Sequence, residues 1–261
     1  MSPATVTAIT AALSTNEPST QADLLMFDVM HQAMRTQSRA LAVALGALDP
    51  TDRVGAEELQ AWYAQMLAGV EHHHIVEDTI FFPMMVAHDP ATEALKATMA
   101  SDHHVLDEHL NAVSESLAAL VLVASDGALV ASMPVGYAAS VRDDAVRATE
   151  GLVACLDDHL DREEAETFPI FLASVPRVAM EQGHGQAMGD DGKKIMPFIA
   201  PWLLPSASAE QQAALLGGLP RLVRTVLRFV WVPRYTKAYP RIVAAQRQVL
   251  DEQASEAVAA A

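Results

Sequence analysis

Apolar residues recur at intervals of three and four along four stretches of the chain, a spacing that places them on one buried face of an α-helix. The first predicted helix begins near Leu24 and ends near Leu45, where the Gly and Pro within residues 46–52 break the pattern. Three further helices are expected at residues 55–82, 91–123 and 136–168. Four such helices with short to moderate connections predict an all-α protein built on an antiparallel up-down four-helix bundle.

Two of the predicted helices replace apolar core positions with the same polar pair. The inward stripe of the second helix continues through His73 and Glu77, and that of the fourth through His159 and Glu163, each followed by a Phe-Pro that is expected to end the pattern. Residues four apart share one face of a helix, so each histidine and glutamate point the same way. The repeated pair predicts two helices that present the same metal-binding chemistry.

The first and third helices each place one histidine on the inward stripe, His31 and His103. We select His103 over its neighbour His104 because His104 shares a face with polar residues. The inward stripe of the second helix likewise selects His73 from the run of histidines at residues 72–74. The remaining histidines are expected at the surface: His72, His74, His88, His104, His109 and His184.

These selections give one buried set of four imidazoles and two carboxylates from four helices. Buried carboxylates without a partner cost several kcal/mol each, and two divalent cations would compensate both at once. Mixed nitrogen and oxygen ligation favours iron, manganese or zinc. The adjacent carboxylates Asp78 and Glu164 are expected to lie behind the ligands or at the surface. The candidate metal ligands are therefore His31, His73, Glu77, His103, His159 and Glu163.

The pattern H…HxxxE…H…HxxxE, with its two Phe-Pro pairs, resembles the hemerythrin-like, or HHE cation-binding, family over about residues 22–172. The resemblance implies a non-haem centre of two Fe ions inside the bundle, bridged by Glu77 and Glu163. Oxygen-carrying hemerythrins have a second histidine four residues after the one on the third helix, and here Asp107 stands at that place. This departure weakens an oxygen-storage function.

The function expected from this site is binding, and reduction, of a small oxidant such as O2, peroxide or NO in stress defence. Two alternatives stay open: a sensor that signals through the C-terminal part of the chain, and iron storage or donation for iron–sulfur repair. The apolar residues expected around the site are Met34, Phe81, Leu106 and Leu110, either as plain core packing or as a gate.

Composition and charge indicate which partners and which cell compartment to expect for the protein. The formal net charge is −16, with the acids concentrated before residue 175, so we expect no nucleic-acid partner. The N-terminus lacks the pattern of a secretory signal, no apolar run is long enough to span a membrane, and Cys155 is the only cysteine. Together these features favour the cytoplasm.

The C-terminal part differs from the rest. Residues 1–21 are expected as a flexible leader, residues 173–205 as a linker with a short apolar segment, and residues 206–261 as a basic helical extension. Seven cations lie between Arg221 and Arg247 with no acid among them. The extension either docks its apolar face on the bundle or uses residues 221–247 to contact an anionic membrane surface or a protein partner.

Overall fold

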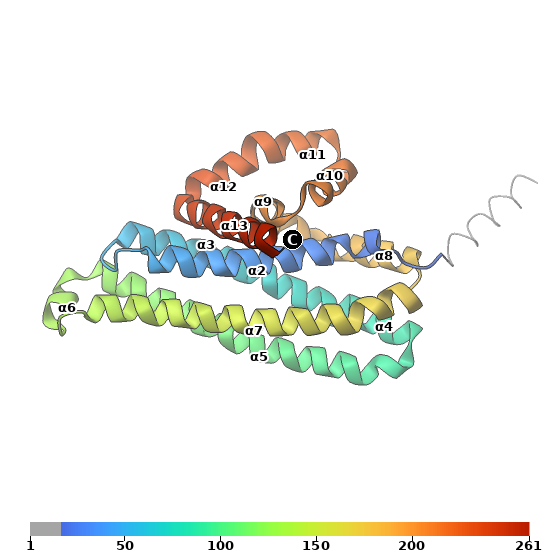
Figure 1. Cartoon of the computed structure of the whole chain (residues 1–261), viewed down its shortest axis with the longest axis horizontal. Helices are drawn as coiled ribbons and strands as arrows, with labels where there is room; N and C mark the ends of the chain where they lie inside the picture. Colours follow the sequence, from blue (N-terminus) through green and yellow to red (C-terminus); the bar gives the residue numbers. More distant parts are fainter. Residues whose placement is uncertain (1–16, 261) are drawn as a thin grey trace, which may run out of the picture.

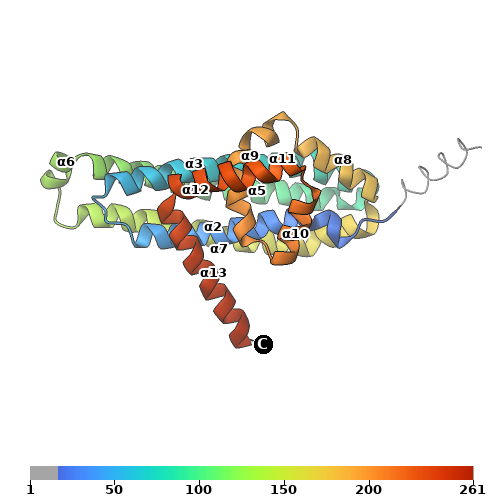
Figure 2. The same ribbon diagram turned by 90° about the horizontal axis from the view of Figure 1, so that it is seen from above.

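The computed structural model describes residues 17–260, so the greater part of the predicted leader lies outside the described residues. The described part consists of helices and the turns between them, which confirms the all-α class. Its centre is formed by four long helices lying side by side, with successive helices running in opposite directions (Figures 1 and 2). They are α2 (Leu25–Gly46), α3 (Arg53–Val76), α5 (Glu93–Ser125) and α7 (Tyr137–Ser174).

Local signals in the sequence fix several helix ends. The Asp52 side chain accepts a hydrogen bond from the backbone N–H of Gly55 at the start of α3, which satisfies a donor that the helix itself leaves free. The Asp126 side chain does the same for Leu129 in the short α6 (Gly127–Ser132), which occupies the connection between α5 and α7. The backbone of Gly136, with φ 88°, takes the left-handed conformation that glycine tolerates and leads into α7.

The second helix does not end at Pro83. A π-helical turn, Glu77–Phe81, follows α3, and the chain continues into α4 (Phe82–His88) with Pro83 in its first turn. The wider turn accommodates a proline that lacks the N–H of a regular helix. The short helix Pro90–Thr92 then leads into α5. In the fourth helix, Pro169 likewise lies inside α7, which extends to Ser174.

The expected linker is helical. Residues 177–187 form α8 (Arg177–Ala187) and residues 190–203 form α9 (Asp190–Leu203). The chain continues through Leu204–Ser206, α10 (Ala209–Gly218), α11 (Arg221–Val226), a second π-helical turn Leu227–Trp231, α12 (Val232–Ala238) and α13 (Pro240–Ala260). These elements, α8 to α13, are called the extension below.

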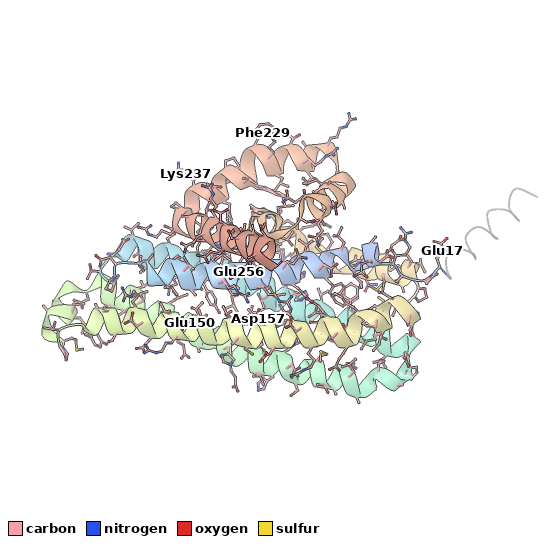
Figure 3. The ribbon with its side chains drawn as sticks, in the orientation of Figure 1. Glu17, Glu150, Asp157, Phe229, Lys237 and Glu256 are labelled. Carbon is pink, nitrogen blue, oxygen red and sulfur yellow. The ribbon has the colours of Figure 1, made fainter. Side chains whose placement is uncertain are left out.

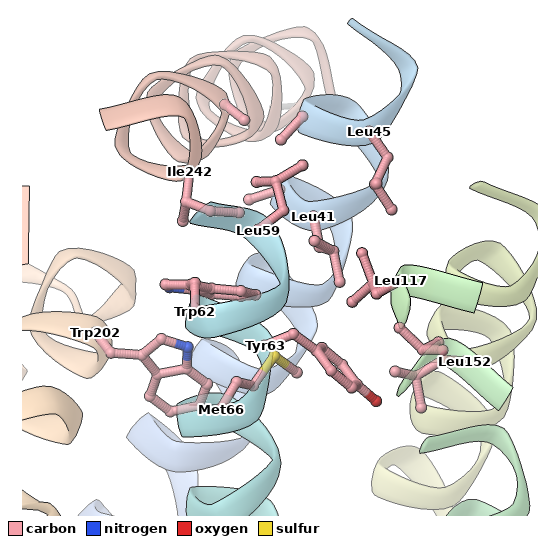
Figure 4. Close-up of a cluster of buried hydrophobic side chains, with 14 of the residues drawn as sticks. Leu41, Leu45, Leu59, Trp62, Tyr63, Met66, Leu117, Leu152, Trp202 and Ile242 are labelled. Atoms are coloured by element: carbon pink, nitrogen blue, oxygen red, sulfur yellow. The ribbon is translucent and has the colours of Figure 1, made fainter. Parts of the chain in front are cut away.

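The extension packs on the side of the bundle formed by α2 and α3 (Figures 1 and 2). Its anchors Trp202 and Ile242 are fully buried and lie beside Leu59 and Trp62 of α3 (Figure 4). The absence of a side chain at Gly69 leaves room for Ile199 of α9, because a β-carbon at Gly69 would lie 2.5 Å from Cδ1 of Ile199 and displace it. Trp202 and Ile199 belong to the stretch expected as a linker with a short apolar segment, and Ile242 belongs to the extension expected at residues 206–261, so both parts contact the bundle.

Polar contacts add to the docking. The indole N–H of Trp62 donates a hydrogen bond of 2.8 Å to the hydroxyl of Tyr235, and both side chains are buried. The side-chain amide of Gln37 donates to the backbone carbonyl of Trp202 at 2.6 Å. The Arg241 guanidinium bonds Glu58 at 2.5 Å and Asp52 at 2.6 Å. The extension is thus fixed to the bundle through specific geometry as well as apolar contact.

Candidate metal centre

The structure brings all six predicted ligands into the interior of the bundle. His31 comes from α2, His73 from α3, Glu77 from the π-helical turn and His103 from α5. The fourth-helix pair comes from α7. Every one of the six side chains is buried, as the inward stripes predicted: His31, His73, Glu77, His103, His159 and Glu163.

Four of these residues form a first group that could hold a metal ion. Ligand atoms of His31, His73, Glu77 and Glu163 all lie within 4.8 Å of one another. The Nε2 atom of His73 is 2.9 Å from Oε1 of Glu77, and Nε2 of His31 is 3.9 Å from the same oxygen. Donor atoms at these separations can share one ion at bond lengths of about 2.0–2.2 Å.

The second group contains a residue that the sequence reasoning left at the surface. His74 is 5% exposed and joins His103 and His159, with ligand atoms within 4.8 Å of one another. Its ring is stacked on that of His103, with centroids 4.2 Å apart. His104 is exposed, so the choice of His103 on α5 agrees with the structure. The placement of His74 at the surface was wrong.

The two glutamates lie between the two groups. Glu77 directs Oε1 toward His73, while its Oε2 is 3.5 Å from Nε2 of His103 in the second group. Oε2 of Glu163 is 3.8 Å from Nε2 of His31 and 3.5 Å from Nε2 of His159. Each carboxylate therefore faces a histidine of both groups, an arrangement suited to bridging two ions.

One histidine of each group is hydrogen-bonded through Nδ1 to a further carboxylate. Oε1 of Glu164 accepts a hydrogen bond of 2.9 Å from Nδ1 of His31 and another of 2.7 Å from Arg35. Asp78 accepts from Nδ1 of His103 at 3.2 Å. With the proton on Nδ1, the Nε2 atom of each ring keeps its lone pair and faces the centre, as a metal ligand must. This geometry agrees with the expectation that Asp78 and Glu164 lie behind the ligands or at the surface.

Comparison with protein families decides the identity of the bundle. The model of the hemerythrin HHE cation-binding domain matches residues 24–171, which is more than half of the chain. The chain belongs to the hemerythrin HHE cation-binding family. No curated protein and no solved structure gave a match. The resemblance inferred from the spacing of histidines and glutamates is therefore confirmed.

The histidines of the hemerythrin-like centre come from different helix positions than in the oxygen-carrier pattern. Asp107, which stands at the place of the second histidine of the third helix, is exposed on α5. His74 instead reaches the second group from α3, one residue after His73 serves the first group. Consecutive positions on a helix point about 100° apart. One helix can therefore supply histidines to both groups.

Electrostatics around the centre keep most of its imidazoles neutral. Burial lowers the pKa of His73, and burial together with His103 lowers the pKa of His74 further and that of His159 to about 3. For His31, burial is outweighed by the carboxylates of Glu163, Glu164 and Glu77, which raise its pKa to about 10. The neutral rings of His73, His74 and His159 offer the lone pairs that metal ions require, whereas His31 has to give up its Nε2 proton when an ion binds.

Glu77 and Glu163 are both buried in the centre, but their pKa values shift in opposite directions. Burial, followed by the charge of Glu77, raises the pKa of Glu163 well above its usual value. Burial acts on Glu77 in the same direction, but His73 and His31 reverse it and hold the pKa of Glu77 low. Two carboxylates so close to one another need nearby positive charge to ionise together.

The residues present fit a metal centre because their donor atoms have no other partners. Most buried side-chain nitrogen and oxygen atoms without a hydrogen-bond partner among the described residues belong to this set, including both oxygens of Glu77 and of Glu163. An unsatisfied buried polar group costs about 1–3 kcal/mol, and more when it is charged. Such a concentration of unsatisfied donors and acceptors at one point matches a site made for cations.

Aromatic rings wall the centre more than the sequence indicated. The predicted neighbours Met34, Phe81, Leu106 and Leu110 are buried. The sequence reasoning missed Phe27 and Phe168, whose ring centroids lie 6.3 and 5.8 Å from that of His31, and Phe82, which stacks on His103 at 6.0 Å. Phe82 and Phe168 belong to the two Phe-Pro pairs. The pairs could therefore have signalled packing against the ligands.

Proposed function

We propose that the hemerythrin-like domain holds a non-haem di-iron centre and binds and reduces a small oxidant such as O2, peroxide or NO. The observation that supports this most is the placement of Glu77 and Glu163 between two adjacent groups of buried histidines. Nitrogen and oxygen donors fit iron, with manganese or zinc as alternatives.

In this proposal His31 and His73 hold one ion, while His74, His103 and His159 hold the other. Glu77 and Glu163 contact both. Such a centre supplies two adjacent redox-active cations at which a small ligand binds and accepts electrons. Reduction of peroxide to water takes two protons and two electrons, so an external reductant is part of the proposal.

The surrounding side chains prepare the site for this chemistry. Glu164 holds the Nδ1 proton of His31, and its side chain is 33% exposed, which connects that proton to solvent. Asp78 holds the Nδ1 proton of His103 in the same way. Phe27 packs against His31 and Phe82 against His103, and these buried rings exclude bulk water from the two ligands. Excluding water strengthens the electrostatic interactions within the site.

The proposal is tested by adding peroxide or NO to reduced, iron-loaded protein and following oxidant consumption and the absorption spectrum. We expect consumption and a spectral change in the wild type and in His104→Ala, whose residue is exposed on α5. The variant His73→Ala is expected to lose both, because it removes a ligand of the first group. Equal turnover by His73→Ala and wild type would refute the assignment of the reaction to this centre.

A second candidate function is that of a sensor that passes the state of the centre to a membrane or partner through the extension. The supporting observation is the outer surface of residues 221–238, from α11 through the second π-helical turn to α12, where Leu222 is 74% exposed and Phe229 is 68% exposed. Figure 3 shows Phe229 and Lys237 on the side of the extension away from the bundle. Exposed cations surround them without a salt bridge within residues 17–260: Arg221, Arg224, Arg228, Arg234 and Lys237.

Apolar side chains surrounded by cations suit the surface of an anionic membrane. Contact of this kind would be peripheral. Among the described residues there is no helix with the length and apolar character needed to cross a bilayer.

A further inference from the structure

A cavity of about 400 Å³ lies between the bundle and the extension, next to the metal centre. Its bundle side is formed by residues of α2 and α3, and its cover by α8, α9, α10 and the second π-helical turn. Cavities of a few hundred Å³ with apolar walls and a few polar groups are typical of small-molecule sites. Neither the fold nor the metal centre requires one here.

The two ends of the cavity differ in chemistry. The end covered by α10 and the second π-helical turn is aliphatic, with Leu215, Leu216, Leu219 and Leu227 in its walls. Further lining residues are leucine, isoleucine and methionine, including Met196. Methionine side chains are flexible and adapt to the shape of an apolar ligand. This part of the cavity therefore suits a flexible aliphatic chain better than a rigid polar molecule.

The end covered by α8 carries the polar groups. His72 and His184 line it, and each donates a hydrogen bond from Nε2 to a backbone carbonyl, His72 to Ala187 at 3.1 Å and His184 to Asp23 at 2.8 Å. These bonds fix the orientation of both rings and leave Nδ1 of each as the remaining polar atom. In a neutral ring that donates from Nε2, the Nδ1 atom only accepts, so a hydroxyl group can donate a hydrogen bond to it whereas a carboxylate cannot.

The polar end also adjoins the metal centre. His73 and Phe27 line the cavity, and the Phe27 ring lies 6.2 Å from that of His73. The ring of His184 is 5.9 Å from that of Phe27. A ligand with its head at this end would lie one aromatic layer from the first group of ligands.

We propose that this cavity binds a single-chain aliphatic molecule whose head is a hydroxyl group, with the head at His72 and His184 and the chain running toward Leu227. Binding does not depend on a metal ion, so the proposal stands apart from the proposed oxidant chemistry. The extension accordingly serves as the cover of a ligand site.

The test is a calorimetric titration of the full chain with laurate and, separately, with dodecanol, both below the concentrations at which they aggregate. We expect saturable binding of one dodecanol molecule per chain, and weaker binding of laurate because its carboxylate has no proton to donate to the two histidines. Met196→Trp is expected to weaken binding at least tenfold by filling the cavity. Leu122→Trp adds the same ring at an exposed position of α5 outside the cavity and should leave binding unchanged.

Leu215→Trp provides a second filled cavity, and circular dichroism identifies any variant that fails to fold. His184→Ala should weaken binding of dodecanol while leaving the aliphatic walls intact. Failure of dodecanol to bind the wild type would overturn the proposal, as would laurate binding as tight as that of dodecanol. Equal dodecanol affinity in the two filled-cavity variants and in Leu122→Trp would overturn it as well.

Discussion

Removing one hydroxyl group from the interface between bundle and extension tests how that interface is held together. In Tyr235→Phe, the indole N–H of Trp62 loses its acceptor at 2.8 Å while remaining fully buried. A buried donor left without a partner costs about 1–3 kcal/mol, and the change in side-chain volume is too small to add a large cavity. We therefore expect the free energy of unfolding to fall by about 1–3 kcal/mol.

Tyr239→Phe is the matched control. Tyr239 packs against Tyr235 with ring centroids 5.3 Å apart, but within the described residues its hydroxyl makes no hydrogen bond to protein. Its loss should change the free energy of unfolding by no more than about 0.5 kcal/mol.

The assay is urea unfolding followed by circular dichroism, with both variants compared at the same protein concentration. For an unfolding slope of about 3 kcal/mol/M, the Tyr235→Phe midpoint should fall by roughly 0.3–1 M. Equal midpoints for the two variants would refute the inference that the bond between Trp62 and Tyr235 stabilises the docked extension.

Further predictions concern the metal centre and the outer surface. His74→Ala should lower the metal bound per chain or weaken its affinity, whereas His104→Ala should not; metal analysis after dialysis distinguishes them, and equal metal content would remove His74 from the centre. Glu164→Gln weakens the acceptor behind His31, so metal affinity should fall about 10- to 100-fold in a chelator competition; unchanged affinity would leave Glu164 as a surface residue only. Phe229→Ser should reduce sedimentation of the protein with vesicles rich in anionic phospholipid. Val258→Ser, at another exposed apolar position, on α13, should not. If neither variant differs from wild type, the outer surface of residues 221–238 is not a membrane contact.

Helical periodicity was enough to predict the fold class and six buried side chains because each inward stripe is regular up to the polar pair. His74 was missed for a geometric reason. A helix in a bundle faces two neighbours, so its buried arc is wide enough for consecutive residues: His73 faces His31 of α2, and His74 stacks on His103 of α5. A single stripe selects only one of them. Two features of the sequence could have identified His74: the run of histidines at residues 72–74, and Asp107 in place of the second histidine of the third helix.

The helices α8 and α9 were missed because glycine and proline are poor local predictors when tertiary packing dominates. Pro197 and Pro201 lie inside α9, yet its residues Phe198 and Trp202 are buried against the bundle. The helical path continues past Pro83 for a similar reason, because the π-helical turn before it accommodates a residue that has no backbone N–H. The same arrangement recurs in the extension, where the turn Leu227–Trp231 precedes Pro233.

The central claim is that the two groups of histidines, with Glu77 and Glu163 between them, hold two iron ions. The most direct measurement is the iron content per chain of protein produced with iron supplied and freed of loosely bound metal. We expect two irons per chain. A value near zero or one, or two ions of another metal in the presence of abundant iron, would contradict the proposed di-iron centre.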